Sequence, residues 1–168
     1  MKLSRMTVAM MLCLALLAVC AAAETTDMQL YRLGTSGYTI EIPASFVEDV
    51  LTEDDIADDM VAYMSSPDTL MDFDVYMFSK EGYPDTIAEY TAEEAAEYDA
   101  FEIVTDGNVN GIEAGWYRAK ESYEDEEFDT LTYVLMDGED YVEISFWLDG
   151  ETAEAEVEAI MNTLAYGE

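Results

Sequence analysis

The chain has 168 residues, with 39 acidic against 6 basic side chains and no histidine, which gives a formal net charge of −33 at pH 7. A charge this negative repels polyanions, and it therefore argues against nucleic acid or an anionic membrane surface as a partner. It favours a solvated, aggregation-resistant surface, or a cationic partner such as a divalent metal, a polyamine or a basic peptide.

Residues 1–23 are expected to be a secretory signal peptide. Lys2 and Arg5 precede an uncharged, mostly apolar run that ends at Val19. This run is shorter than the about 20 apolar residues that a spanning helix needs. Small residues follow it, which suits cleavage before Glu24.

Both cysteines, Cys13 and Cys20, lie in this leader, so the mature chain is expected to be free of cysteine. A lipoprotein with Cys20 as its acylated first residue is the alternative, although Val19 stands where such leaders prefer a small residue. Cleavage after residue 23 removes two bases and no acid, which brings the net charge to −35. We expect no transmembrane segment in the mature chain, because no second apolar run of membrane length follows.

The first half of the mature chain shows strand and turn signals. Residues 24–30 are expected to be a flexible tail, and residues 31–168 a single domain. Alternation over 38–42 predicts a half-buried strand. Residues 45–59 suit a short helix or loop, and residues 60–80 suit two strands joined by a turn.

A helix is expected next, with Thr91 and Glu94 as its capping box and an Ala-rich run to about Tyr98. Ile87 and Tyr90 are candidates for extending this helix backward. Four strands should then follow, at about 101–105, 112–120, 128–136 and 141–148.

The last two strands should be joined at Asp137 and Gly138 by a loop of even length, because an odd loop would put their apolar sets on opposite faces. The even loop places Leu131, Tyr133 and Leu135 beside Val142, Ile144 and Phe146. The chain should close with a helix whose apolar side holds Ala153, Val157, Ile160, Met161 and Leu164, with Gly167 as its stop.

This order predicts an α+β domain with a mainly antiparallel sheet of about six to seven strands and helices packed on it. The stretches "GYTIEIPASF" and "YVEISFWLDGETAEAEVEAIMNTL" resemble the PsbP-like fold, which DcrB-like envelope proteins of bacteria also have. Members of that family range from photosystem accessory proteins to a nuclear-transport factor and share no active site. The resemblance therefore implies a fold and an accessory or binding role at the cell envelope, without an activity.

One loop resembles the start of a calcium site. Asp106, Asn108, Asn110 and Gly111 match D-x-[DN]-x-[DN]-G, but Glu113 and Tyr117 break the pattern further on. The flanks suit strands, and Asn-Gly is a strong signal for a type I′ hairpin turn. We therefore expect a structural hairpin here, with a calcium site as the alternative.

Two acidic clusters are further candidates for gathering a cation, although charge runs are usually solvated loops. The first holds Asp54, Asp55, Asp58 and Asp59, and the second holds Glu124, Asp125, Glu126, Glu127 and Asp129. On the last strand, Tyr141 and Trp147 share a face with Glu143 and Ser145. An exposed aromatic platform is one interpretation, but a helix layer over this face would bury both rings, which is the usual fate of large aromatic residues.

Catalysis has little support in the sequence. The absence of histidine and mature cysteine excludes Ser-His and Cys-His pairs and imidazole zinc sites. A pair of carboxylates acting as in glycosidases remains, and it would need two acids in one cleft with separated pKa values. We expect a non-enzymatic accessory or binding domain of the cell envelope, with no catalytic, cofactor or metal residues assigned. An extracytoplasmic protein that binds divalent cations through its acidic loops is the alternative.

Overall fold

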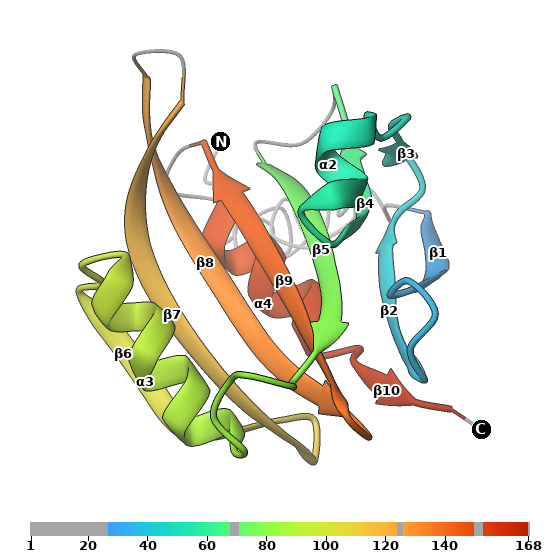
Figure 1. The fold of residues 1–168 in the computed structure, drawn as a ribbon. Helices are drawn as coiled ribbons and strands as arrows, with labels where there is room; N and C mark the ends of the chain where they lie inside the picture. Colours follow the sequence, from blue (N-terminus) through green and yellow to red (C-terminus); the bar gives the residue numbers. More distant parts are fainter. Residues whose placement is uncertain (1–26, 68–70, 124–125, 150–152, 168) are drawn as a thin grey trace, which may run out of the picture.

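Two antiparallel sheets form the framework of the protein. The computed structural model describes residues 27–67, 71–123, 126–149 and 153–167 (Figure 1). The large sheet has seven strands, in the spatial order β3 (Val47–Glu48), β4 (Met60–Ser65), β5 (Met71–Ser79), β9 (Asp140–Leu148), β8 (Glu126–Asp137), β7 (Ile112–Tyr123) and β6 (Glu102–Val109). The small sheet consists of β1 (Met28–Arg32), β2 (Tyr38–Pro43) and β10 (Ala165–Tyr166).

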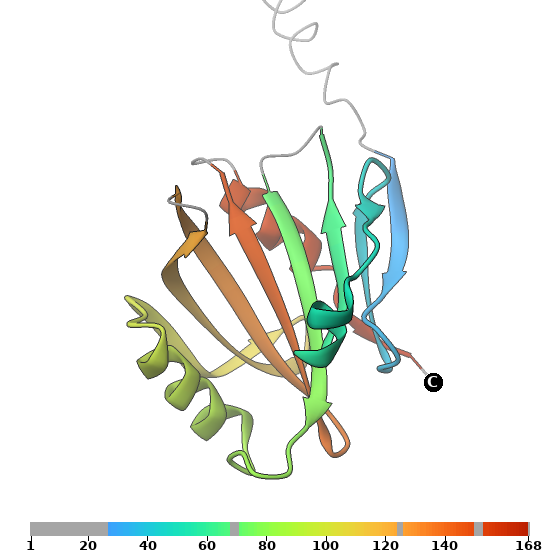
Figure 2. The ribbon, with the colours of Figure 1, turned by 45° about the horizontal axis from the view of Figure 1, so that its top comes forward.

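Helices lie on both faces of the large sheet. Figure 2 shows α3 (Ile87–Glu97) and α2 (Glu53–Ala57) in front of it and α4 (Ala153–Met161) behind it. The main core fills the space between the back face, α4 and the small sheet, and Phe73, Ile144 and Phe146 are fully buried there. A second core lies under α3 and contains Ile87, Tyr90, Tyr117, Val134 and Tyr141. The α+β class with a seven-stranded sheet is therefore confirmed.

The hairpins form as the sequence predicted. The loop between β8 and β9 has two residues, and Asp137 pairs with Asp140 across it. Asn110 and Gly111 connect β6 and β7 with φ angles of 50° and 88°, the positive values that a type I′ turn requires. The predicted β8–β9 register is confirmed by the pairs Leu131–Phe146, Tyr133–Ile144 and Leu135–Val142.

The described chain begins with a strand that the sequence did not suggest. The expected tail ended at residue 30, but β1 begins at Met28 and pairs with β2 over five residue pairs. Most side chains of this edge strand are exposed, Leu30 at 73%, and Tyr31 alone packs against the core, so the strand shows no clear alternation of apolar and polar residues. The expected signal peptide, with Cys13, Cys20 and the junction before Glu24, lies outside the described residues.

Two helix boundaries also differ from the prediction. The Thr86 side chain caps α3 and accepts a hydrogen bond of 3.2 Å from the backbone N–H of Glu89. Thr91 lies inside α3, because the helix begins earlier, at the T-x-x-E sequence that runs from Thr86 to Glu89. The last helix, α4, ends at Met161, and residues 165–166 pair with β2 instead of continuing the helix to Gly167. No helix among the described residues is long and apolar enough to cross a membrane.

Candidate functional site

An acidic cleft of about 380 Å³ lies on the front face of the large sheet, between α3 and the end of α2. Its carboxylates are Asp58, Asp59, Asp74, Glu94, Glu97, Glu121 and Glu143, and its aromatic walls are Tyr76, Phe78, Tyr83, Tyr90, Tyr98, Tyr117 and Trp147. Thr132 and Ser145 add hydroxyl groups to the lining. No lysine or arginine of the described residues lines the cleft, so none of its lining residues offsets the negative charge of these acids.

Strand alternation brings the two deepest carboxylates together. Asp74 and Tyr76 lie on the front face of β5, and Glu143 and Ser145 lie on the same face of β9. The paired residues are Asp74 with Ser145 and Tyr76 with Glu143, which makes Asp74 and Glu143 diagonal neighbours. Diagonal neighbours on a sheet are about 7–8 Å apart at Cα, close enough for their charges to interact.

Asp74 is only 2% exposed, which is rare for a carboxyl group. Its Oδ2 accepts a hydrogen bond of 2.8 Å from Trp147 Nε1, while its Oδ1 is buried and has no hydrogen-bond partner. Burial raises the pKa of Asp74 from 3.8 to about 7, and the charge of Glu121 adds to the rise. Hydrogen bonds from Trp147, from the backbone N–H of Asp74 and from Ser145 oppose this rise without cancelling it. This carboxyl group therefore changes its charge near neutral pH.

Glu143 has a similar environment. Its Oε1 is buried and has no hydrogen-bond partner. Burial raises its pKa from 4.5 to about 7, and the charges of Glu94 and Asp74 contribute, while a hydrogen bond with Tyr90 lowers it. Two carboxyl groups, each with one oxygen that accepts no hydrogen bond, thus lie in one cleft, where the charge of each makes ionisation of the other more costly.

The walls of the acidic cleft are neutral aromatic side chains. Burial and the charge of Glu143 raise the pKa values of the Tyr90 and Tyr117 hydroxyls far above neutral pH, so both keep their protons. The Tyr90 ring stacks on Tyr141, with centroids 4.2 Å apart and planes inclined by 21°. The Tyr98 and Tyr117 rings also lie nearly parallel, at 6.0 Å. Aromatic faces beside carboxylates are suited to a cation.

A second hollow, which we call the side cleft, adjoins the acidic cleft and has a volume of about 430 Å³. Both clefts share Asp74, Tyr76 and Trp147. The side cleft adds the apolar side chains of Val50, Leu51, Met60 and Phe128, together with Tyr63 and the acids Asp49, Asp55 and Asp72. The Phe128 and Trp147 rings meet edge to face at 5.9 Å on its wall.

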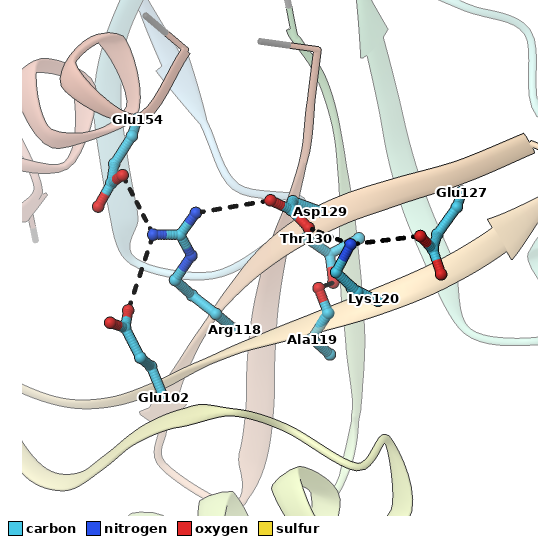
Figure 3. Close-up of polar contacts among 8 residues, drawn as sticks. All are labelled: Glu102, Arg118, Ala119, Lys120, Glu127, Asp129, Thr130 and Glu154. Atoms are coloured by element: carbon cyan, nitrogen blue, oxygen red, sulfur yellow. Dashed lines mark hydrogen bonds and ion pairs between the residues drawn. The ribbon is translucent and has the colours of Figure 1, made fainter. Parts of the chain in front are cut away.

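The basic residues of the described part contact other regions. Arg118 follows Tyr117 on β7 and therefore points to the back face, away from the acidic cleft. There its guanidinium group lies 3.1 Å from Glu154, 3.7 Å from Glu102 and 3.9 Å from Asp129 (Figure 3). Lys120 pairs with Glu127 and Asp129, and Lys80 pairs with Glu139. Arg32 donates a hydrogen bond to the backbone oxygen of Ser36.

The calcium-like loop is the hairpin turn that the sequence favoured. Asn108 Oδ1 accepts a hydrogen bond of 2.8 Å from the Gly111 N–H, and Asn110 Nδ2 donates one of 2.8 Å to the Leu164 oxygen. Asp106 lies on the surface, next to an irregularity in the β6–β7 pairing. The two amide side chains therefore close the turn and attach it to the C-terminal segment.

The first acidic cluster is divided between different surroundings. Asp58 and Asp59 line the acidic cleft, whereas Asp55 lines the side cleft and closes the capping box of α2 with Thr52. Asp54 lines neither of the two clefts. Among the residues the structure describes, no three acids lie close enough together to hold a metal ion.

The second acidic cluster is partly neutralised by its neighbours. Glu124, Asp125 and the side chain of Glu126 lie outside the described part. Glu127 and Asp129 form the ion pairs with Lys120 and Arg118 given above.

The two aromatic residues of the last strand have different environments. Tyr141 is completely buried under α3 and donates a hydrogen bond of 2.7 Å to the Pro84 oxygen, so its predicted core position is confirmed. Trp147 lies six residues further along β9, is only half-buried and forms the wall between the two clefts. The helix layer therefore covers one end of this face.

Sequence reasoning missed Asp74 and the role of Glu143. The available signal was an acid in phase with aromatic residues on one strand face, in "DVYMF" and again in "YVEISFW". Nothing local shows that these two strands are neighbours, because β5 and β9 are separated by α3 and three other strands in the sequence.

Comparisons with known proteins show similarity of fold. No family model and no curated protein matches the sequence. The solution structure of the cyanobacterial PsbP protein CyanoP from Synechocystis sp. PCC 6803 matches with a TM-score of 0.60 and 9% identity, over 88% of this chain and 96% of that one. A crystal structure from Bacteroides thetaiotaomicron VPI-5482 matches with a TM-score of 0.55 and 16% identity, over 82% of this chain. This chain spans only 50% of the Bacteroides chain.

A third structure is LpqN, described as involved in cell envelope biogenesis of Mycobacterium tuberculosis, with a TM-score of 0.49 and 8% identity over 84% of this chain and 91% of that one. The match to CyanoP shows that the protein has a PsbP-like α+β fold, and identities this low show similarity of fold alone.

Proposed function

We propose that this protein is an extracytoplasmic, non-catalytic binding module that holds a cationic ligand in the acidic cleft. The observation that carries the proposal is the pair of buried, unpartnered oxygens, Asp74 Oδ1 and Glu143 Oε1. A buried polar atom without a partner costs free energy, and two such atoms in one cleft point to a missing positive group. A bound cation would satisfy both carboxylates and allow them to ionise.

The extracytoplasmic location rests on the leader expected at residues 1–23, with a lipid anchor at Cys20 as the alternative. An accessory role is in keeping with the PsbP-like fold, which the chain shares with CyanoP. Fold alone does not define a ligand, so the cleft carries the rest of the proposal.

The lining of the acidic cleft favours binding over catalysis. It contains no histidine or cysteine, the usual proton carriers and nucleophiles. Burial raises the pKa values of both Asp74 and Glu143, so the two acids have similar environments, whereas an acid–base pair of carboxyl groups uses contrasting ones.

A cation held by the exposed acidic loops is the weaker candidate. Only Asp58 and Asp59 of the first acidic cluster reach the acidic cleft, and Glu127 and Asp129 of the second already pair with basic side chains. The free oxygens of Asp74 and Glu143 make the acidic cleft the better position for a cation.

The test is thermal unfolding of the purified protein with a panel of chloride salts, namely calcium, magnesium, methylammonium, hexylammonium and spermidine. Each is compared with sodium chloride at equal ionic strength, so that general screening is subtracted. At least one cation should raise the Tm of the wild type beyond its sodium control. The same cation should give a much smaller rise in Asp74→Asn and Glu143→Gln.

The matched control is Asp106→Asn, which removes a charge from an exposed position outside the clefts. It should respond as the wild type does. If no cation exceeds its sodium control, or if Asp74→Asn responds as fully as Asp106→Asn, the proposed function is wrong.

A further inference from the structure

The two clefts differ in chemistry although they meet at one wall. The acidic cleft is rich in carboxylates and tyrosine rings, whereas the side cleft contributes Val50, Leu51, Met60 and Phe128. Trp147, Asp74 and Tyr76 belong to both. A ligand with a positive group at one end and an apolar group at the other therefore matches both hollows, with Asp49, Asp55 and Asp72 beside the apolar side chains of the second.

The positive group is better matched by an ammonium than by a metal ion. Calcium takes 6–8 oxygen ligands, and no three acids among the described residues are grouped closely enough for such a site. An ammonium group needs fewer oxygens, because it donates a small number of hydrogen bonds and also interacts with aromatic faces. Tyr76, Tyr90 and Tyr117 supply such rings, and burial keeps all three hydroxyls protonated.

The apolar group would lie against Leu51 and Phe128. Val50 is almost fully exposed at this edge, at 96%, and Leu51 is half-buried, so the side cleft presents apolar surface that the fold itself does not cover. Acids at its margin, such as Asp49 and Asp72, repel an anionic tail.

We infer that the ligand is an organic ammonium compound with an apolar chain. Its ammonium group lies between Asp74 and Glu143 beneath α3, and its chain passes Trp147 into the side cleft. This inference rests on the proposed function, because it specifies the class of cation that the acidic cleft holds. It also assigns a role to Trp147, whose ring separates the charged end of the ligand from the apolar end.

The affinity for the ligand should depend on the length of its apolar chain. Burial of one methylene contributes about 0.8 kcal/mol, which corresponds to about a fourfold gain in affinity. A series from methylammonium to octylammonium should therefore bind more tightly with each added carbon until the side cleft is full. Metal ions have no such chain and should gain nothing from the apolar side chains of the side cleft.

The experiment is a titration of the purified protein with methyl-, butyl-, hexyl- and octylammonium chloride, calcium chloride and neutral 1-hexanol, followed by calorimetry at constant ionic strength. We expect one site, an affinity that rises about fourfold per methylene, and little binding of calcium or hexanol. Trp147 should report the same event by a change in fluorescence, measured in a Trp116→Phe background.

Two sets of variants separate the ends of the ligand. Glu143→Gln and Asp74→Asn should weaken binding of every amine by at least about tenfold, the usual effect of losing a charged hydrogen-bond partner. Leu51→Ser and Phe128→Ser should leave methylammonium unchanged and remove the dependence on chain length. Asp106→Asn, which is remote from both clefts, should change neither.

The outcomes test the class of the ligand separately from the cation-binding function. If calcium or methylammonium binds in the acidic cleft as well as octylammonium does, the organic class is wrong and the cation-binding function stands. If 1-hexanol binds as tightly as hexylammonium, the apolar contact alone drives binding and the inference fails. If no cation of the series binds, the inference fails, and the proposed function fails with it unless magnesium or spermidine raises the Tm in the thermal test.

Discussion

Trp147 Nε1 donates a hydrogen bond of 2.8 Å to Asp74 Oδ2 and so joins β9 to β5 at the boundary between the two clefts. The bond satisfies one oxygen of a carboxyl group that is almost completely buried, and it leaves Oδ1 without a partner. Burial raises the pKa of Asp74 to about 7, because desolvation outweighs the stabilising effect of this bond. An unsatisfied acid of this kind destabilises the unliganded fold at neutral pH, and the first prediction follows from that cost.

Stability should fall as pH rises between about 4 and about 7. In this window the folded protein holds protons on Asp74 and Glu143, whose pKa values are about 7, while the unfolded chain has released them. Asp74→Asn and Glu143→Gln remove this cost. Each should therefore raise stability by roughly 1–3 kcal/mol at about pH 8 and by much less at about pH 5.

Urea unfolding of wild type and variants at the two pH values measures this difference. Asp106→Asn controls for the general relief of negative charge, and its effect on stability should depend far less on pH. Equal gains for Asp74→Asn at both pH values would contradict the raised pKa.

The fluorescence of Trp147 should titrate with Asp74. Because the indole N–H donates to Asp74 Oδ2, a change in the charge of that carboxyl group alters the field at the ring. In a Trp116→Phe background we expect the fluorescence to change around neutral pH, and we expect Asp74→Asn to remove most of this change. A flat signal from about pH 5.5 to 8.5 would show that the carboxyl group does not titrate there.

Gly115 should be essential for seating α3 on the sheet. A Cβ atom at this position of β7 would overlap Thr91 Oγ1. Gly115→Ala should cost roughly 1–3 kcal/mol, as overpacking usually does. The double variant with Thr91→Ala should recover part of the loss, because it removes Oγ1 and Cγ2 but leaves the Cβ atom of residue 91 at 2.8 Å. Gly167→Ala is the control, since a Cβ there meets no atom within 4 Å. Chemical denaturation of all four proteins would test the pairing, and a lack of recovery would place the strain elsewhere.

Arg118 should matter more than the other bases for the back face. Its side chain is 18% exposed and contacts Glu102, Asp129 and Glu154, which come from β6, β8 and α4. Arg118→Met leaves these acids without their shared counter-charge, so we expect a loss of about 1 kcal/mol that added salt partly restores. Lys120 connects only β7 and β8, so Lys120→Met should lower stability less. Similar losses for the two variants would argue against a special role for Arg118.

The N-terminus should lie at Glu24 in the exported protein. Intact-mass analysis of protein recovered from the extracytoplasmic fraction should give the mass of residues 24–168. A mass that begins at Cys20 and includes acyl groups would support the lipoprotein alternative. Retention of the full 168 residues in exported material would contradict both expectations.

Local features of the sequence predicted much of the sheet. The β8–β9 register followed from parity, because side chains alternate and only an even loop keeps Leu135 and Val142 on one face. The turn at Asn110 and Gly111 followed from the positive φ angles that these residues tolerate. The N-cap of α3 was misplaced, because two T-x-x-E sequences lie five residues apart and local propensity alone does not choose between Thr86 and Thr91.

The candidate site exists only once the strands are assembled. Alternation within each strand already puts Asp74 and Glu143 on faces that also carry aromatic residues. It did not determine that β5 and β9 are neighbours, since strand order depends on how the whole chain buries its apolar surface. That pairing places two carboxyl groups diagonally beneath α3 and Trp147 beside them. The desolvation that raises their pKa values therefore exists only in the assembled fold.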